Sequence, residues 1–331
     1  MRTHLGRIGT TAAAILCVLV AAGCQNNDPV VEPTRAHIYI ADSGNNRIVR
    51  MDDMDGKGWK SLQSSTSQKS TPFDTPSGVY ADPAGHIFIA DTGNSRIVRV
   101  DNMSGDNWIP VGTRGDSKGQ FRSPISVVTD RENRIYVTDK GNFRVTRMDD
   151  MSLGKWITLG GMGKGTGHFG ATGGLFVDSN EKVYLTDGID VVNDLFNNRI
   201  VQFTDFDSSG WKQFGNGIGA GKGQFNKPSA VCLDSKGRFY IADTYNNRIV
   251  RMDAIDGSGW VSLGSSEGSG VNQFNNPTGI WVDASNHIFI ADTSNDRIVR
   301  MDDMTGKNWI TIGTTGDGPS QFRAPTCVMV R

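Results

Sequence analysis

The sequence predicts an all-β fold, a six-bladed β-propeller made of four-stranded antiparallel blades. Six copies of one pattern recur along the chain: a strand that ends in aspartate, a short Gly/Asn loop and an arginine-led strand, as in IYIADSGNNRIVR and IFIADTSNDRIVR. A tryptophan closes every copy. A period of about 40 to 50 residues with four strands per unit is typical of propeller blades, which bury their faces by stacking in a ring. The aspartates lie 49, 48, 48, 56 and 49 residues apart and are Asp42, Asp91, Asp139, Asp187, Asp243 and Asp292.

The register of the six copies extends beyond the aspartate. An arginine follows it by five residues and a tryptophan by seventeen residues in five copies, and a seven-residue insertion displaces both in the fourth copy. The arginines are Arg47, Arg96, Arg144, Arg199, Arg248 and Arg297. The tryptophans are Trp59, Trp108, Trp156, Trp211, Trp260 and Trp309.

Each copy is expected to contain four short strands in a fixed order. An apolar strand such as GVYAD comes first, followed by a strand of the IYIAD type, one of the RIVRM type and one around the tryptophan. Strands rich in Ile, Val and Tyr with turn residues between them indicate antiparallel meanders. A Gly-rich loop ending in Phe, and usually Pro, leads into each first strand, as at Phe73 and Pro76.

The two ends of the repeat region predict how the ring closes. The first copy starts at Ala36 without its first strand, whereas residues 325–331 form a first strand with nothing after it. Pairing the C-terminal strand with the three N-terminal strands completes a sixth blade and leaves no open sheet edge.

These residues resemble a known family. The pattern Pro-x-Gly-Ile/Val-x-x-Asp, followed by Ile/Val-Tyr/Phe-Ile/Val-Ala-Asp-Ser/Thr-x-Asn-x-Arg, is similar to NHL repeats over roughly residues 36 to 331, although Ser126, Ala230 and Cys327 replace the family glycine. Kelch and WD-repeat propellers share the period, but their signatures do not recur here. The resemblance implies a propeller without a single activity, because NHL proteins include RNA-binding regulators, receptor ectodomains, an amidating lyase and bacterial lipoproteins.

The amino terminus predicts export and lipidation. Residues 1–23 resemble a lipoprotein signal peptide, in which two arginines precede an apolar stretch too short for a membrane span. Val20 to Gly23 and Cys24 resemble a lipobox, which makes Cys24 the expected lipidated residue; cleavage by ordinary signal peptidase is the alternative. Residues 24–35 are expected to be a flexible tether to the propeller at 36–331. Gln25 in place of Asp favours the outer membrane in a diderm bacterium.

Composition bears on partners and compartment. Removal of residues 1–23 takes two arginines from 34 basic residues and leaves 32 against 35 acidic residues, a net charge of −3. This balance argues against nucleic acid as a partner. Cys232 and Cys327 lie in blades that are not neighbours, so no disulfide is expected. We expect a monomer that contacts the membrane through its lipid anchor only.

The recurrent Asp and Arg residues are interpreted as scaffold. A carboxylate and a guanidinium can run acid/base chemistry, but a group repeated six times around a ring is not one active site. An aspartate that accepts backbone N–H bonds beside an arginine would brace each loop, and the recurring tryptophans would pack between blades. The turn at Asp53–Gly58 resembles half of a calcium loop, but its counterparts lack the ligands. The sequence therefore assigns no catalytic residue, metal or cofactor.

The expected mouth of the central channel is small and neutral. Its residues are Ser77, Ile125, Gly173, Ser229, Thr278 and Thr326. Lactonase-like six-bladed propellers place acidic metal ligands around this channel, so the chain departs from them where an enzyme would need its residues. Binding is therefore favoured over catalysis.

Function is expected where one copy departs from the others. The largest departure is the insertion at residues 188–196, which contains Ile189, Asp190, Asp194 and Phe196. Beside it, Lys140 and Tyr245 are interpreted as replacing the Ser or Thr that follows the aspartate in four copies, and Phe143 as replacing Asn or Ser. Basic residues precede three first strands: Arg122, Lys227 and Arg323.

We therefore expect one loop face to bind an envelope protein, a peptide or a glycan. Insertions on rigid scaffolds often carry function, but a loop that the ring merely tolerates is the alternative. The competing function is a lyase or hydrolase, lactonase-like or lyase-like, with its site at the channel mouth.

Overall fold

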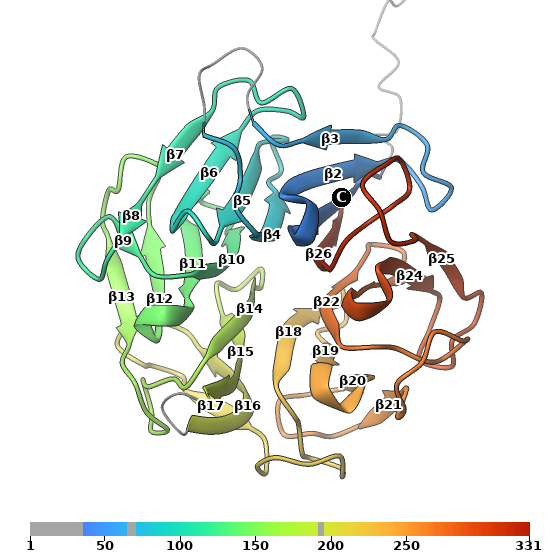
Figure 1. Ribbon diagram of the computed structural model, residues 1–331. Coiled ribbons are helices and arrows are strands. Elements are labelled where there is room, and N and C mark those ends of the chain that lie inside the picture. Colours follow the sequence, from blue (N-terminus) through green and yellow to red (C-terminus); the bar gives the residue numbers. More distant parts are fainter. Residues whose placement is uncertain (1–35, 65–70, 191–194) are drawn as a thin grey trace, which may run out of the picture. The chain divides into compact units, whose positions relative to one another are not determined.

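The computed structural model describes residues 36–64, 71–190 and 195–331. Six four-stranded antiparallel sheets surround a common centre in the unit formed by Ala36–Arg331, as predicted (Figure 1). In each sheet the strand nearest the centre, here called the inner strand, is followed outward by the other three strands. The lipobox Cys24, the signal segment and the tether lie outside the described residues.

The blades are numbered from the one that contains the first strand. Blade 1 contains β26 (Pro325–Val330), β1 (Ile38–Asp42), β2 (Arg47–Met51) and β3 (Lys60–Leu62). Blade 2 contains β4 (Pro76–Ala81), β5 (Ile87–Asp91), β6 (Arg96–Val100) and β7 (Ile109–Val111). Blade 3 contains β10 (Pro124–Thr129), β11 (Ile135–Asp139), β12 (Arg144–Met148) and β13 (Ile157–Gly160).

The second half of the ring repeats this order. Blade 4 contains β14 (Thr172–Val177), β15 (Val183–Asp190), β16 (Leu195–Phe203) and β17 (Lys212–Phe214). Blade 5 contains β18 (Pro228–Leu233), β19 (Phe239–Asp243), β20 (Arg248–Met252) and β21 (Val261–Leu263). Blade 6 contains β22 (Pro277–Val282), β23 (Ile288–Asp292), β24 (Arg297–Met301) and β25 (Ile310–Ile312).

Short elements join the second and third strands or precede an inner strand. In four blades a single 3-10 turn follows the conserved aspartate: η1 (Ser43–Asn45), η2 (Lys140–Asn142), η3 (Thr244–Asn246) and η4 (Thr293–Asn295). In the loop before blade 3, β8 (Thr113–Arg114) pairs in parallel with β9 (Gln120–Phe121). Among the described residues, no helix is long and apolar enough to cross a membrane.

The ring closes by pairing the two ends of the chain, as the sequence predicts. Strand β26 pairs antiparallel with β1, so that Ile38 lies opposite Val330 and Ala41 opposite Cys327. Every blade therefore has the same four strands, and β1 is not left as an unpaired edge.

A bulge at the start of the inner strand positions the channel mouth. In blade 2 the register with β5 shifts between Pro76 and Gly78, which leaves Ser77 outside the regular ladder. The inner strands of blades 3, 5 and 6 shift at the same place. Because bulges re-aim a side chain, the residue after the proline turns toward the channel instead of joining the sheet.

The core lies between neighbouring blades. Strands β5, β11, β19 and β23 are buried along their whole length, as expected for strands covered on both faces. Each Gly-rich loop places its phenylalanine against the tryptophan of the next blade, as Phe73 does with Trp108 at 4.9 Å between ring centres. Aromatic pairs at this distance add about 0.5–1.5 kcal/mol beyond the burial of their surface.

The insertion in the fourth copy lengthens a hairpin. Strands β15 and β16 continue past the conserved aspartate, with Ile189 opposite Phe196 and Asp190 opposite Leu195. Asp194, which the sequence places in the candidate binding site, lies outside the described residues. The described part of the insertion therefore belongs to the blade 4 sheet.

Candidate ligand-binding face and channel

The conserved aspartates hold the loops that join neighbouring blades. In blade 5, Oδ2 of Asp243 accepts hydrogen bonds from Nε of Arg248 at 2.7 Å and from Asn246 at 2.8 Å. Its Oδ1 accepts the N–H of Asn226 at 2.7 Å. Arg248 then donates to the carbonyl of Gln224 at 2.8 Å. Both carboxylate oxygens are thus occupied within the protein, and the carboxylate has no exposed surface.

The same contacts recur in the other five blades. Each conserved aspartate is fully buried and accepts the Nε–H of its arginine at 2.6 to 2.9 Å. Each arginine also lies over the tryptophan of its own blade, with the guanidinium carbon 5.5 to 5.9 Å from the ring centre. Charge-assisted bonds and cation–π contacts of this kind fix geometry.

Burial raises the pKa of these aspartates. For Asp243 it outweighs the N–H of Asn226 and the side chains of Asn246 and Arg248, which favour the charged form. The same direction and the same leading cause hold for Asp42, Asp91, Asp139, Asp187 and Asp292. A carboxylate that has no contact with solvent and whose lone pairs are taken by loop donors is placed to hold a loop.

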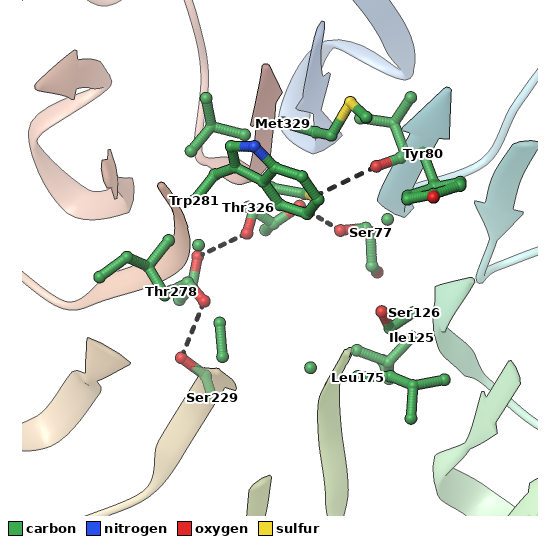
Figure 2. Close-up of a pocket in the computed structure, with 18 of the residues that line it drawn as sticks. Ser77, Tyr80, Ile125, Ser126, Leu175, Ser229, Thr278, Trp281, Thr326 and Met329 are labelled. Atoms are coloured by element: carbon green, nitrogen blue, oxygen red, sulfur yellow. Dashed lines mark hydrogen bonds between the residues drawn. The ribbon is translucent and has the colours of Figure 1, made fainter. Parts of the chain in front are cut away.

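Paired hydroxyl groups surround much of the channel mouth on the side of the aspartate turns. In four blades a Ser or Thr follows the conserved aspartate, and its hydroxyl is here called the turn hydroxyl. A second Ser or Thr is the second residue of the inner strand, and its hydroxyl is here called the mouth hydroxyl. The two hydroxyls form a hydrogen bond. The pairs are Ser43 with Thr326, Ser77 with Thr92, Ser229 with Thr244, and Thr278 with Thr293. Figure 2 shows the mouth hydroxyls Ser77, Ser229, Thr278 and Thr326 around the opening.

The protons of these hydroxyls all have acceptors within the protein. Each turn hydroxyl donates to the carbonyl of the proline that starts the next inner strand, as Thr244 does to Pro277 at 2.8 Å. Three mouth hydroxyls also reach a carbonyl of the next blade, as Thr278 does that of Thr326 at 3.1 Å. Because a hydroxyl carries one proton and two lone pairs, this ring offers a ligand acceptor sites but no spare donor.

Blades 3 and 4 interrupt the ring of hydroxyls. Ile125 and Gly173 stand at the mouth positions, and Lys140 and Gly188 follow the aspartates. Thr138 partly substitutes, because its hydroxyl donates to the carbonyl of Gly173 at 2.8 Å. No side chain among the described residues donates to the carbonyls of Pro228 and Ser229, whose counterparts in blades 6, 1 and 2 accept hydroxyl protons.

A cavity of about 200 Å³ occupies the channel behind this ring. Small residues on the inner strands, such as Gly78, Ser126 and Ala230, leave the space open. Its remaining walls are mainly apolar and include Leu175, Trp281 and Met329 (Figure 2). Since a dry cavity of about 150 Å³ is enough to hold benzene, the channel can accept a group of that size.

Three aromatic side chains from alternate blades meet across the channel. Trp281 of blade 6 lies 6.5 Å from Tyr80 of blade 2 and 6.3 Å from Phe176 of blade 4, measured between ring centres. All three occupy the fourth position after the first residue of their inner strand, at the end away from the aspartate turns. They make the deep part of the channel aromatic, a feature that the sequence reading did not identify. The signal was present in the sequence, because Trp281 is the one tryptophan outside the sixfold series.

The titratable groups in the cavity wall are poorly suited to acid/base chemistry. Burial raises the pKa of the Tyr80 hydroxyl and raises that of the Cys327 thiol to about 11. A general acid or base works best with a pKa near the operating pH. Among the described residues, no group of three His, Cys, Asp or Glu side chains is placed to hold a metal ion.

The candidate rim residues lie on two sets of loops that the structure brings together. The N–H of Gly141, which follows Lys140, bonds the carbonyl of Arg122 at 2.7 Å, and the N–H of Gly44 bonds that of Arg323 at 2.8 Å. Lys140, Arg122 and Arg323 are exposed. Phe143 is partly exposed and has a left-handed backbone with φ of 54°.

The structure corrects the register that we assigned to Tyr245. The turn hydroxyl of blade 5 is Thr244, so of Lys140 and Tyr245 only Lys140 replaces such a residue, and Tyr245 lies one position further on. That position turns its side chain toward the loop before the inner strand. The amine of Lys227 lies 2.9 Å from the Tyr245 hydroxyl, to which it donates, and 4.3 Å from the ring centre.

Blade 5 and the insertion are neighbours on this face. The N–H of Lys227 bonds the side-chain oxygen of Asn198 at 2.8 Å, just after the inserted residues. The inserted backbone at Gly188 also runs beside Lys227. Met162 and Ile218, in the loops on either side of blade 4, are 56% and 54% exposed. The side chains of Ile189, Asp190 and Phe196 are outside the described part of the structure.

Comparison with known proteins agrees with the repeat and the fold. A model of the NHL repeat matches residues 73–100, 121–148 and 225–252, which lie in blades 2, 3 and 5. No curated protein matches the sequence. A Bacteroides caccae protein of unknown function has a similar structure, with 10% identity, 90% of this chain and 99% of that chain covered, and a TM-score of 0.59.

Two lyase structures share the architecture. A streptogramin B lyase matches at 14% identity over 75% of this chain and 71% of its own, with a TM-score of 0.52. A catalytically inactive virginiamycin B lyase from Staphylococcus aureus, solved with quinupristin, matches at 15% identity over 74% and 71% of the two chains, with a TM-score of 0.51. Identity this low shows a common fold and nothing about chemistry.

Proposed function

We propose that this NHL-repeat propeller is a non-catalytic binding module of the bacterial cell envelope, tethered through Cys24, which takes a protein or peptide partner on the face of its aspartate turns. The observation that carries the proposal is the clustering of irregular residues. Lys140, Phe143, Lys227 and Tyr245 flank the insertion in blade 4, on loops that bond one another. Polar contacts and exposed aromatic groups on a rigid ring are what a recognition face requires.

Phe143 supports this assignment by its backbone conformation. In the other blades the same position holds Asn, Ser or Asp with positive φ. These small polar residues adopt the left-handed region readily, whereas phenylalanine does so at a cost of about 1 kcal/mol or more. A bulky aromatic group kept partly exposed in a strained position supports a role in contact.

Exposed apolar groups on both sides of blade 4 add area to the face. Met162 and Ile218 belong to loops whose carbonyls are bonded from the aspartate turns: Asn197 donates to Gly163 at 2.9 Å and Asn246 donates to Gly219 at 2.7 Å. Methionine and aromatic residues are enriched in protein interfaces. A protein or peptide is therefore favoured over a glycan as the partner.

The alternative function, a lyase or hydrolase at the channel mouth, has support from the fold only. The hydroxyl ring has no spare proton donor, and the Tyr80 and Cys327 groups in the wall have raised pKa values. No residue among those described is placed as a general base toward the cavity. We therefore keep binding as the proposed function.

Partner capture tests the binding face. The full chain, cross-linked in its native envelope, is expected to capture a partner in a defined ratio. The double variant Lys227→Ala/Tyr245→Ala should lose most of it, because the pair lies at the centre of the proposed contact. The matched control is Asn276→Ala/Ser294→Ala, which removes the equivalent contact of blade 6, where Asn276 donates to Ser294 at 3.2 Å. Equal capture by both variants would overturn the proposal.

Lipidation is tested separately. Cys24→Ser in the full chain should abolish incorporation of labelled palmitate and move the protein from the membrane fraction to the soluble fraction. Retention in the membrane with no label in the native chain would contradict the tether.

A further inference from the structure

We propose that the central channel binds a small uncharged alcohol whose aromatic body is about the size of a benzene ring. The aromatic body lies in the cavity, and the hydroxyl group of the ligand donates a hydrogen bond at the mouth. This inference goes beyond the proposed partner-binding face and does not rest on it.

The wall of the cavity favours an apolar group without charge. Its volume of about 200 Å³ exceeds the roughly 150 Å³ that suffices for benzene. Trp281, Leu175 and Met329 contribute apolar surface from blades 6, 4 and 1. No described residue that lines the cavity is an aspartate, glutamate, lysine, arginine or histidine. A charged group would therefore lose hydration there without gaining a counter-charge.

Aromatic side chains form the floor of the cavity, at the end opposite the mouth. Trp281 and Tyr80 both line the cavity, and each keeps part of its surface accessible. Their ring centres are 6.5 Å apart, and Phe176 packs against Trp281 from a third blade at 6.3 Å. Aromatic rings add edge-to-face and offset contacts to the burial of their surface, so this floor favours an aromatic body over an aliphatic one.

The depth of the cavity sets the length of the ligand. Ser77 at the mouth and Tyr80 at the floor lie three residues apart on strand β4. At about 3.3 Å per residue, this separation is roughly 10 Å. A benzene ring with a two-carbon chain and a terminal hydroxyl group has a similar length. Such a molecule can touch the floor with its ring and the mouth with its hydroxyl group.

The mouth hydroxyls direct their protons away from the channel. In blade 6, Thr293 donates to the carbonyl of Pro325 at 2.8 Å, and its oxygen lies 2.5 Å from the hydroxyl oxygen of Thr278. One proton must lie between these two oxygens, and because Thr293 has already used its own, Thr278 is the donor. The same arrangement holds in blades 1, 2 and 5. The mouth hydroxyls therefore present lone pairs to a ligand.

This direction decides which ligand group the ring of hydroxyls accepts. The hydroxyl group of a ligand can donate to these lone pairs, whereas a carboxylate brings only acceptors and an ether has no proton to give. An ammonium group can donate, but the described wall offers it no carboxylate in exchange for the water that it loses. A neutral alcohol is the group that matches both the mouth and the wall.

Calorimetry with four matched probes tests the site on the full chain. 2-Phenylethanol, its methyl ether, 3-phenylpropionate and 2-phenylethylammonium share the aromatic body and differ at the other end. We expect the alcohol to bind one site with a Kd below about 1 mM. The ether should bind at least about threefold more weakly, and both ions at least about tenfold more weakly. No saturable binding of the alcohol, or equal or tighter binding of any other probe, would overturn the proposal.

Removal of mouth hydroxyls tests the polar end of the site. Ser229→Ala/Thr278→Val takes the hydroxyls from blades 5 and 6, and Ser77→Ala/Thr326→Val takes them from blades 2 and 1. At least one of these variants should weaken binding of the alcohol by about threefold or more while the methyl ether binds as before. Unchanged binding of the alcohol in both variants would overturn the placement of its hydroxyl group.

The matched control is Ser262→Ala/Thr311→Val. It makes the same two substitutions as the first variant in the same two blades, but on the exposed outer strands β21 and β25. It should alter the affinity of neither probe, and a loss equal to that of the mouth variants would also overturn the placement. The midpoint of thermal unfolding verifies that each variant is folded.

A filled cavity should remove the alcohol and the ether together. Ile125→Trp enlarges a side chain that lines the cavity at the mouth, and Val128→Phe enlarges one in the same blade at the level of the aromatic floor. If one variant fails to fold, the other decides. Binding of the alcohol at native affinity in every folded variant of this pair would show that the aromatic body lies outside the channel and would overturn the proposal.

Discussion

Blades 6, 1 and 2 differ from blades 3 and 4 at the channel mouth. They agree with them in the contacts that hold the loops between neighbouring blades. Both groups keep the buried aspartate, the arginine and the tryptophan with the same bonds. Blades 6, 1 and 2, like blade 5, carry the hydroxyl pairs, as between Ser77 and Thr92, whereas blades 3 and 4 do not. The framework and the mouth are therefore separate layers: residues that hold the ring are constant, whereas residues at the channel mouth vary.

The largest expected effect comes from the constant layer. Asp243→Ala and Asp139→Ala should each lower the free energy of unfolding by about 3–5 kcal/mol, because the change leaves a buried arginine and a loop N–H without their acceptor. Chemical denaturation measures the loss. The exposed turn residue Asp303, which accepts bonds from Thr305, provides the control, and Asp303→Ala should cost less than about 1 kcal/mol. Unequal losses in blades 5 and 3 would show that the braces are not equivalent.

A smaller effect is expected from the mouth of the regular blades. Thr244→Val keeps the shape of the side chain and removes the hydroxyl that donates to Pro277 at 2.8 Å. The free energy of unfolding should fall by about 1–3 kcal/mol, since a buried carbonyl loses its donor. Thr305→Val, in an exposed turn, should fall within about 0.5 kcal/mol of the native chain. Similar losses in the two variants would mean that the ring of hydroxyls does not stabilise the mouth.

The reverse substitution tests the interrupted arc. Gly188 lies beside Pro228, and an added Cβ would stand 3.4 Å from the carbonyl oxygen of Pro228. Gly188→Ser should therefore restore a donor and stabilise the fold by about 0.5–1 kcal/mol. Gly188→Ala separates this bond from the entropic benefit of replacing glycine. If the serine variant is no more stable than the alanine variant, the carbonyl of Pro228 does not gain a hydrogen bond from a hydroxyl at position 188.

The framework could be predicted from the sequence because it repeats. Six copies in register define the strands and the pair of strands that closes the ring. The repeated spacing of Asp, Arg and Trp is enough to identify these residues as scaffold from the sequence. Five of the six residues expected at the mouth line the cavity, and each of these five follows a proline: Ser77, Ile125, Ser229, Thr278 and Thr326. The bulge that turns these residues toward the channel begins at the same proline, as at Pro76 in blade 2.

The parts that the sequence could not predict depend on contacts between blades. The aromatic group of Tyr80, Phe176 and Trp281 forms because alternate inner strands face one another across the ring. The bond between Lys227 and Tyr245 depends on which of the neighbouring residues Thr244 and Tyr245 turns toward the preceding loop. The register that we assigned from the sequence placed Tyr245 at the position that Thr244 occupies. The insertion was expected as a loop, but its backbone continues the hairpin of β15 and β16 through residue 190 and from residue 195.

The smallest effect concerns the turns at the other end of the blades, where blades 2 and 6 differ from blades 3 and 5. Blades 2 and 6 have Phe88 and Phe289 in their second strands, whereas blades 3 and 5 have Tyr136 and Tyr240. The Tyr136 hydroxyl donates to Asp130 at 3.0 Å and is buried. Burial, with the nearby Asp130 charge, raises the pKa of Tyr136 to about 12 from its ordinary value of 10.0.

This shift makes alkaline stability a test of the comparison. A folded pKa above the unfolded one means that the contribution of Tyr136 to stability is complete below pH 10 and is lost as the pH rises toward about 12. The free energy of unfolding should therefore fall more steeply over this range in the native chain than in Tyr136→Phe/Tyr240→Phe, whose blades then match blades 2 and 6. Absorbance of the phenolate during the same titration identifies the group that ionises. Coincident slopes for the two proteins would show that these tyrosines ionise without cost to the fold, and that blades 3 and 5 differ here from blades 2 and 6 in sequence only.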